Sequence, residues 1–259
     1  MAKGDDEQDQ SRYVVSAVDS ALEVLELVAR QPGLSLVELS KLADLNKSRT
    51  MRFLVTMELR GLVRKDANGN FYLAAKTAIL GDRARNQLDF LQLLQPILDR
   101  LRDETSETVQ YRILDGLQTV CLAKSDSHLD IRVHTETGRP RELYVGSSKS
   151  ILAYGSDELL NRVLASPRAN FTDKTLVSEE ELRKQLSEIR DTGYSVSRGE
   201  RIEGAIAIGA PILNKDQSAT SCLSLLGPEF RIASKIDQLG AALMKAADSV
   251  SDLARFGKA

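Results

Sequence analysis

Residues 36–73 read LVELSKLADLNKSRTMRFLVTMELRGLVRKDANGNFYL, and this stretch decides the fold of the N-terminal part of the chain. Ser35, with Glu38 three positions later, predicts a capping box at the start of a short helix. After a brief turn, residues 47–61 predict a second helix that ends at Gly61, because glycine is favoured just past a helix C-terminus. The stretch therefore predicts two helices joined by a short turn.

A hairpin is predicted directly after the second helix. Residues 62–74 predict two short strands, because Asn68 and Gly69 are typical of a tight turn between antiparallel strands. Upstream, residues 18–31 carry apolar side chains at three- and four-residue steps, which predicts another helix that Pro32 and Gly33 end. Three helices followed by a hairpin predict a winged helix-turn-helix.

The apolar positions predict which helix faces pack inward. The predicted buried side chains are Val18, Ala21, Leu22, Leu25, Val28 and Ala29 in the first helix, Leu36, Leu39, Leu42 and Ala43 in the second, and Met51, Leu54, Val55 and Leu59 in the third. On the third helix, Arg49, Arg52, Thr56 and Arg60 recur at three- and four-residue steps, so they predict a ridge that faces solvent.

Positive charge is concentrated on this motif. The whole chain has 35 Lys and Arg against 37 Asp and Glu, whereas residues 35–65 contain seven basic and three acidic side chains. A basic helix face fits the major groove, and the hydroxyl and N–H groups of its first turn suit phosphate oxygens or base edges. The predicted partner is a double-stranded DNA operator. The predicted DNA-binding residues are Lys47, Ser48, Arg49, Thr50, Arg52 and Thr56 on the helix, with Arg64 and Lys65 at the wing.

The rest of the chain predicts a second, larger domain. Strands are expected over 108–116, 117–126, 130–136, 205–213 and 218–227, and helices over 148–166, 179–192 and 234–256. This order predicts an α+β domain with one antiparallel sheet covered by helices. The predicted organisation is a disordered tail over 1–12, the DNA-binding domain over 13–73, a linker helix over 74–88, and an effector-binding and oligomerisation domain over 89–259.

Several other classes of function lack support in the sequence. Cys121 and Cys222 are isolated and predict buried thiols, and His128 and His134 match no usual metal-ligand spacing. Because there is no nucleophile elbow, phosphate-binding loop or dinucleotide fingerprint, we expect no catalytic site, metal or cofactor. The acidic first ten residues and the lack of a long apolar run predict a cytoplasmic protein that does not associate with a membrane.

From Val14 to about Ala254 the chain resembles the IclR family of bacterial regulators. In the N-terminal part the resemblance rests on VVSAVDSALEVLELVA and on the helix with Lys47, Ser48, Thr50 and Arg52. In the C-terminal part it rests on LRDETSETVQYRILDG, GRPRELYVGSSKSILA, DTGYSVSRGERIEGAIAIGAPIL and SLLGP. The resemblance implies a GAF-like effector domain, a homodimer or dimer of dimers, and a small-molecule effector, commonly an organic or aromatic acid.

The resemblance also implies an effector site. One wall is Gly146, Ser147 and Ser148 ahead of a helix, and the opposite wall comprises Glu200, Ala207, Cys222 and Ser224. A helix start with free N–H groups suits a carboxylate, which predicts that an anion lies there. The sequence departs from the family pattern at Ser148, where a glycine usually precedes the lysine, and at Tyr144 and Val145, where smaller residues are usual.

Three hypotheses of function follow. The first is a ligand-responsive regulator that binds a near-palindromic operator and senses an organic or aromatic acid. The second is a small-molecule enzyme fused to a DNA-binding module, and the third is a protein-interaction scaffold with a winged helix. The basic ridge favours the first.

Overall fold

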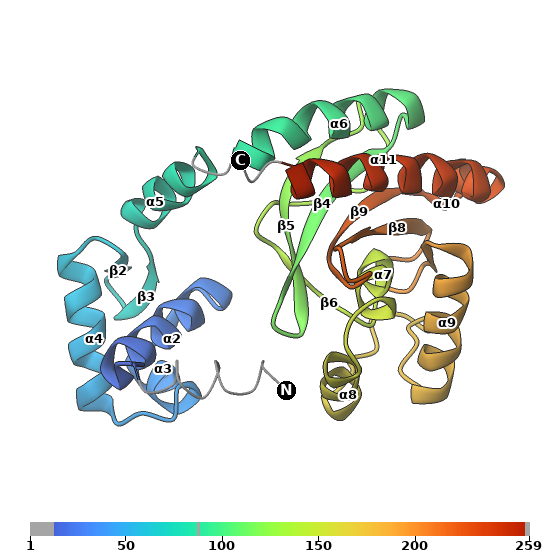
Figure 1. Ribbon diagram of the computed structural model, residues 1–259. Helices are drawn as coiled ribbons and strands as arrows, with labels where there is room; N and C mark the ends of the chain where they lie inside the picture. Colours follow the sequence, from blue (N-terminus) through green and yellow to red (C-terminus); the bar gives the residue numbers. More distant parts are fainter. Residues whose placement is uncertain (1–12, 87–88, 257–259) are drawn as a thin grey trace. The chain divides into compact units, whose positions relative to one another are not determined.

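A computed structural model describes residues 13–86 and 89–256 of the chain. The chain forms two compact units, one up to Gln87 and one from Leu88 onward (Figure 1). The predicted tail over 1–12 and the last two residues of the predicted linker lie outside the described residues. Within the described part, no helix combines the length and the apolar character that crossing a membrane requires.

The N-terminal unit is a winged helix-turn-helix, as predicted. It consists of α2 (Ser16–Arg30), β1 (Leu34–Ser35), α3 (Leu36–Leu42), α4 (Lys47–Leu59), β2 (Val63–Lys65), β3 (Asn70–Leu73) and α5 (Ala75–Asn86). The three strands form an antiparallel sheet in the order β1-β3-β2. Helices α3 and α4 form the helix-turn-helix, and β2 and β3 form the wing.

Local side-chain hydrogen bonds set the ends of these elements. The capping box of Ser35 and Glu38 is present at the start of α3, which confirms that prediction. The Asn46 side chain accepts a hydrogen bond of 2.8 Å from the backbone N–H of Arg49 and so caps α4. In the wing, the Asp66 carboxylate accepts from the N–H groups of Asn68 and Asn70, each at 2.9 Å.

The predicted inward faces of the helices were partly wrong. The core of this unit is formed by Val24, Val28, Leu39, Ala43, Leu54, Met57, Val63 and Phe71. Seven residues predicted to be buried are exposed instead, namely Val18, Leu22, Ala29, Leu42, Met51, Val55 and Leu59. Apolar residues lie on more than one face of α2 and α4, so periodicity alone does not identify the face that packs inward.

The C-terminal unit is an antiparallel sheet with helices on both faces. Its elements are α6 (Asp89–Thr105), β4 (Thr108–Asp115), β5 (Gln118–Ser125), β6 (Pro140–Glu142), η1 (Gly146–Ser148), α7 (Lys149–Ala153), α8 (Asp157–Ala165), α9 (Glu179–Thr192), β7 (Ser195–Arg198), β8 (Ala205–Leu213), β9 (Ala219–Pro228), α10 (Glu229–Ile232), η2 (Ala233–Lys235) and α11 (Ile236–Phe256). The strand order is β6-β5-β4-β9-β8-β7.

Two apolar cores lie on opposite faces of this sheet. Helices α6 and α11 cover one face, where Leu98, Val109 and Leu225 belong to the same core (Figure 1). Helices α7, α8 and α9 contribute to a second core, which contains Cys222. Because side chains alternate along a strand, β4 directs Val109 and Tyr111 toward α6 and α11, and Gln110 and Arg112 toward the other face.

Two predicted elements differ in the structure. Residues 130–136 form no strand, and two of their carbonyls bond to side chains instead of to a neighbouring strand: Ile131 O accepts from Arg231 at 3.0 Å and Thr135 O from Lys124 at 2.8 Å. Strand β6 pairs with β5 instead. The helix predicted over 148–166 divides into α7 and α8, because Ser156 caps a new helix start, and Ser148 belongs to the preceding η1.

Candidate functional site

The exposed surface of α4 has one polar and one apolar row of side chains. Ser48, Arg52 and Thr56 form the polar row, at successive four-residue steps. Met51, Val55 and Leu59 form the apolar row beside it, and their exposed fractions are 36%, 40% and 83%. Residues four apart lie above one another on a helix surface, so both rows run along its axis.

Two predicted DNA-binding residues have contacts within the unit. Thr50 is fully buried and its hydroxyl donates to Asn46 O at 3.1 Å, so its inclusion in the exposed DNA-binding set was wrong. The Arg49 guanidinium donates to Ser16 O at 3.4 Å and to Ser20 Oγ at 3.3 Å, and it lies over the Phe53 ring. Arg49 therefore connects α4 to the start of α2.

The wing presents two exposed basic residues, as predicted from sequence. Arg64 and Lys65 are exposed on β2, and the Arg64 guanidinium lies 4.5 Å from the centre of the Tyr72 ring. Hydrogen bonds from the backbone N–H groups of Asn70 and Asn68 lower the pKa of Asp66, whose carboxylate orders the adjoining turn. Lys47, Ser48, Arg52 and Thr56 on α4 are exposed as well.

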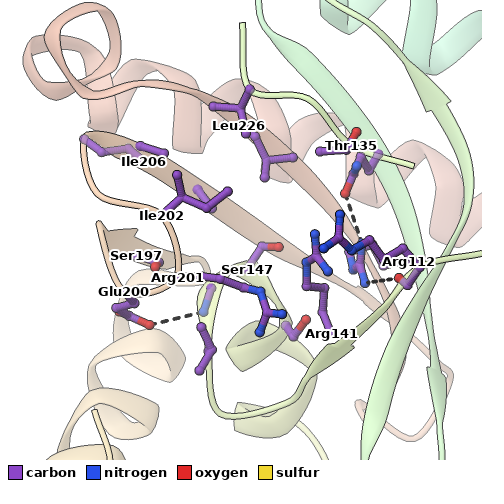
Figure 2. A pocket seen from close by; sticks show the side chains of 18 of the residues that line it. Arg112, Thr135, Arg141, Ser147, Ser197, Glu200, Arg201, Ile202, Ile206 and Leu226 are labelled. Atoms are coloured by element: carbon purple, nitrogen blue, oxygen red, sulfur yellow. Dashed lines mark hydrogen bonds between the residues drawn. The ribbon is translucent and has the colours of Figure 1, made fainter. Parts of the chain in front are cut away.

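A pocket lies on the face of the large sheet that carries Gln110 and Arg112 (Figure 2). Five of the seven predicted effector-binding residues line it: Gly146, Ser147, Ser148, Glu200 and Ala207. Cys222 and Ser224 do not. Cys222 packs in the second core, where burial raises the pKa of its thiol to about 11, and the Ser224 hydroxyl donates to Ser147 Oγ at 2.7 Å.

The η1 wall of the pocket is held in place by buried contacts. Glu200 accepts a hydrogen bond of 3.1 Å from the Gly146 N–H and pairs with Lys149, whose side chain is fully buried. Ser148 and Thr119 hydroxyls are 2.7 Å apart and share a hydrogen bond. Gly209 of β8 permits close approach of η1, because a Cβ there would overlap with the carbonyl oxygen of Ser147.

One N–H group of the predicted anion position at the start of this helix is already occupied. The Gly146 N–H, which we expected to be free for a ligand carboxylate, is bonded to the carboxylate of Glu200. Burial lowers the pKa of Lys149, and the charge of Glu200 opposes that effect. The chain thus supplies its own anion at this place, paired with its own cation.

Two arginines that sequence reasoning missed lie at one end of the pocket. Arg112 is 4% exposed and donates to Gln110 Oε1, Thr119 Oγ1 and the carbonyls of Thr119 and Arg139. Arg141 is half-buried, and burial lowers its pKa to about 10. Within the described residues neither arginine has a carboxylate at ion-pair distance, whereas Arg201 pairs with Glu142.

Two buried polar atoms in the same wall lack partners. Gln110 Nε2 and Thr135 Oγ1 are buried and make no hydrogen bond to any part of the chain that the structure describes. Both residues line the pocket. Leaving a buried polar group unsatisfied costs free energy, so both atoms require a partner from outside the described chain, such as ordered water or a ligand.

The opposite end of the pocket is apolar. Ile202 and Ile206 lie there, away from Arg112 and Arg141, and Leu226 also lines the cavity (Figure 2). A concave site with a few converging polar groups and an apolar wall is typical of small-molecule binding. The charge of the two arginines favours a ligand with an anionic group and an apolar body.

Comparisons with known proteins agree with this architecture. Residues 17–67 match the family described as the IclR helix-turn-helix domain, and residues 83–252 match that described as the bacterial transcriptional regulator IclR C-terminal domain. The chain belongs to the IclR family. It is thus a transcriptional regulator with a DNA-binding helix-turn-helix and an effector-binding C-terminal domain.

Individual regulators are similar to this chain over nearly its whole length. HTH-type transcriptional regulator BhcR from Paracoccus denitrificans is 31% identical, over 92% of this chain and 86% of that protein. An IclR transcriptional regulator from Alicyclobacillus acidocaldarius has a TM-score of 0.78 at 25% identity, covering 93% of this chain and 99% of that structure. An IclR homologue from Microbacterium hydrocarbonoxydans, solved with 4-hydroxybenzoate, has a TM-score of 0.71 at 21% identity. The match covers 92% of this chain and 99% of that structure.

Arg52→Ala is expected to weaken specific DNA binding and leave the fold intact. Arg52 is central in the exposed polar row of α4, and loss of one good base contact costs about 1–3 kcal/mol, roughly 5- to 150-fold in affinity. Titration of a labelled operator duplex measures the effect. Arg30→Ala, which also removes an exposed positive charge but lies on α2, is the matched control; equal effects of the two variants would contradict a specific role for Arg52.

Proposed function

We propose that this IclR-family regulator binds a near-palindromic operator and senses an organic or aromatic acid. The observation that carries the proposal for the ligand is the buried guanidinium of Arg112, which lines a pocket without a carboxylate partner among the residues described. Burial of a cation is costly, and a ligand carboxylate compensates it by charge-assisted hydrogen bonds.

The pocket supports a particular placement of the acid. The carboxylate would lie at the end where Arg112, Arg141 and the Nε2 atom of Gln110 converge, instead of at the start of the η1 and α7 segment. The apolar body would lie against Ile202, Ile206 and Leu226. An aromatic acid has this division between one charged end and one flat apolar part.

On the DNA side, the proposal rests on α4 and the wing. Lys47, Ser48, Arg52 and Thr56 lie on the exposed part of α4, and Arg64 and Lys65 lie on the wing. One such helix reads few base pairs, so two or more copies of the chain would bind together, as a homodimer or dimer of dimers, to a site with matching symmetry. Sedimentation of the protein on its operator tests this assembly.

A screen of organic and aromatic acids by thermal denaturation tests the ligand proposal. The first probe is 4-hydroxybenzoate, because an IclR homologue is solved in complex with it. An acid present at a hundred times its Kd is expected to stabilise the native state by about 2.7 kcal/mol. The same acid should change the affinity for the operator, because effector and DNA sites of a regulator are linked.

Neutral analogues are the control for this screen. The primary amide of each acid keeps the apolar body and lacks the charge, so it should stabilise the protein much less. Equal stabilisation by acid and amide would contradict the role proposed for Arg112. A stabilising acid that left operator affinity unchanged would contradict effector sensing.

A further inference from the structure

We infer that Met51 and Val55 on α4 recognise thymine methyl groups in the operator. The inference rests on the proposed function, because it takes α4 to be the helix that enters the major groove. It concerns which bases the protein selects, and it is carried by the apolar row on the exposed face of α4.

The position of these two side chains is unusual for apolar residues. Met51 and Val55 are separated by one helical turn, both are exposed, and neither belongs to the core of the N-terminal unit. The buried residues of α4 are Thr50, Leu54 and Met57, on the other side of the helix. Exposed apolar side chains gain free energy when a partner removes them from water.

Neighbouring residues indicate what that partner is. Arg52 follows Met51 in sequence and lies three residues before Val55, so its position on the exposed surface of α4 adjoins the apolar row. Ser48 and Lys47 precede the row in the first turn of α4. A surface that mixes cations, hydroxyls and methyl groups suits a groove walled by phosphates, and not a purely apolar protein face.

The major groove offers one kind of methyl group. The C5 methyl of thymine projects into it, whereas the other base edges there present hydrogen-bond donors and acceptors. The N-terminal turns of a recognition helix approach the base edges most closely. Met51 and Val55 lie in the second and third turns of α4, and Leu59 is its last residue. We therefore assign base recognition to Met51 and Val55 and not to Leu59.

Replacement of thymine by deoxyuridine isolates the methyl group, because the two bases pair with adenine identically. The full-length protein is first used to select its preferred duplex from a random-sequence library. Copies of that duplex are then made with deoxyuridine at each thymine in turn, and their affinities are measured. Loss of one buried methyl group is expected to weaken binding about fourfold.

Variants assign the effect to particular side chains. Met51→Gln and Val55→Ser should each bring the ratio of affinities for the thymine and deoxyuridine duplexes toward one, at different positions of the site. Leu59→Ser is the matched control: it removes an equally apolar and more exposed side chain of the same row and should leave the ratio unchanged. Arg52→Ala should weaken binding to both duplexes alike.

The outcomes separate this inference from the function on which it rests. If the wild-type protein selects a duplex but binds its deoxyuridine copies equally well, the inference is overturned and operator binding stands. The inference is also overturned if neither Met51→Gln nor Val55→Ser changes the ratio. Failure to enrich any sequence would overturn sequence-specific operator binding together with the inference.

Discussion

Glu200→Gln is expected to lower the free energy of unfolding of the C-terminal unit by about 3–5 kcal/mol, because it leaves the ammonium of Lys149 buried without a counter-ion. For a unit of this size the expected fall in Tm is about 6–20 °C. Differential scanning calorimetry measures it. The double variant Lys149→Met with Glu200→Gln contains no buried charge at this place and should recover most of the loss.

The destabilisation should also depend on pH. Burial lowers the pKa of Lys149, and without Glu200 nothing in the pair opposes that effect. The unfolded state then binds more protons at Lys149 than the native state, so the stability of Glu200→Gln should rise with pH relative to that of the wild type. The buried ion pair would be contradicted if the free energy of unfolding of Glu200→Gln were less than about 1 kcal/mol below that of the wild type at neutral pH. It would also be contradicted if this difference grew as the pH rises.

Arg112→Met is expected to weaken binding of the acid at least about thirtyfold, because the ligand carboxylate would be desolvated without its main cationic partner. The probe is 4-hydroxybenzoate or the acid with the largest thermal shift, and isothermal titration measures its Kd. Arg141→Gln should also weaken binding, by a smaller factor because Arg141 is half-buried.

The control for these variants is Arg139→Met. Arg139 lines the same pocket but is exposed, so its loss should change the Kd least. Because Arg112 also bonds to Thr119, the Tm and the operator affinity of Arg112→Met without acid must show that the protein is folded. An unchanged Kd in a folded Arg112→Met protein would remove the basis for the proposed anion site.

The elements of the N-terminal unit were predictable from local signals, whereas the faces of its helices were not. Capping residues and turn glycines act over three or four positions, so Ser35, Glu38 and Gly69 identify boundaries from sequence alone. The inward face depends on which apolar residues find a core. Met51 and Val55 were predicted to be buried because they are apolar. In the structure both are exposed, so apolar character alone did not identify the face of α4 that packs inward.

The pocket was predictable only in part. The family resemblance indicated Gly146 to Ser148, Glu200 and Ala207, while Gln110 and Arg112 were read only as part of a strand. A signal was present: two polar side chains alternate with Val109 and Tyr111 in a strand of a sheet that helices cover on both faces. The role of Arg112 in a pocket could not be predicted, because it depends on the fold bringing Arg112 together with Arg141 and the 130–136 segment.

Gly209 sets a limit on how this pocket can diversify in evolution. The backbone of β8 at Gly209 packs directly against the backbone of η1 at Ser147. Any side chain at position 209 would therefore displace Ser147 and with it one wall of the cavity. Ile202, Leu226 and Thr135 contribute side chains to the lining, and exchange of these residues would reshape the cavity without moving its support. A lineage that adapts to a different acid is therefore expected to change those positions and to retain glycine at 209.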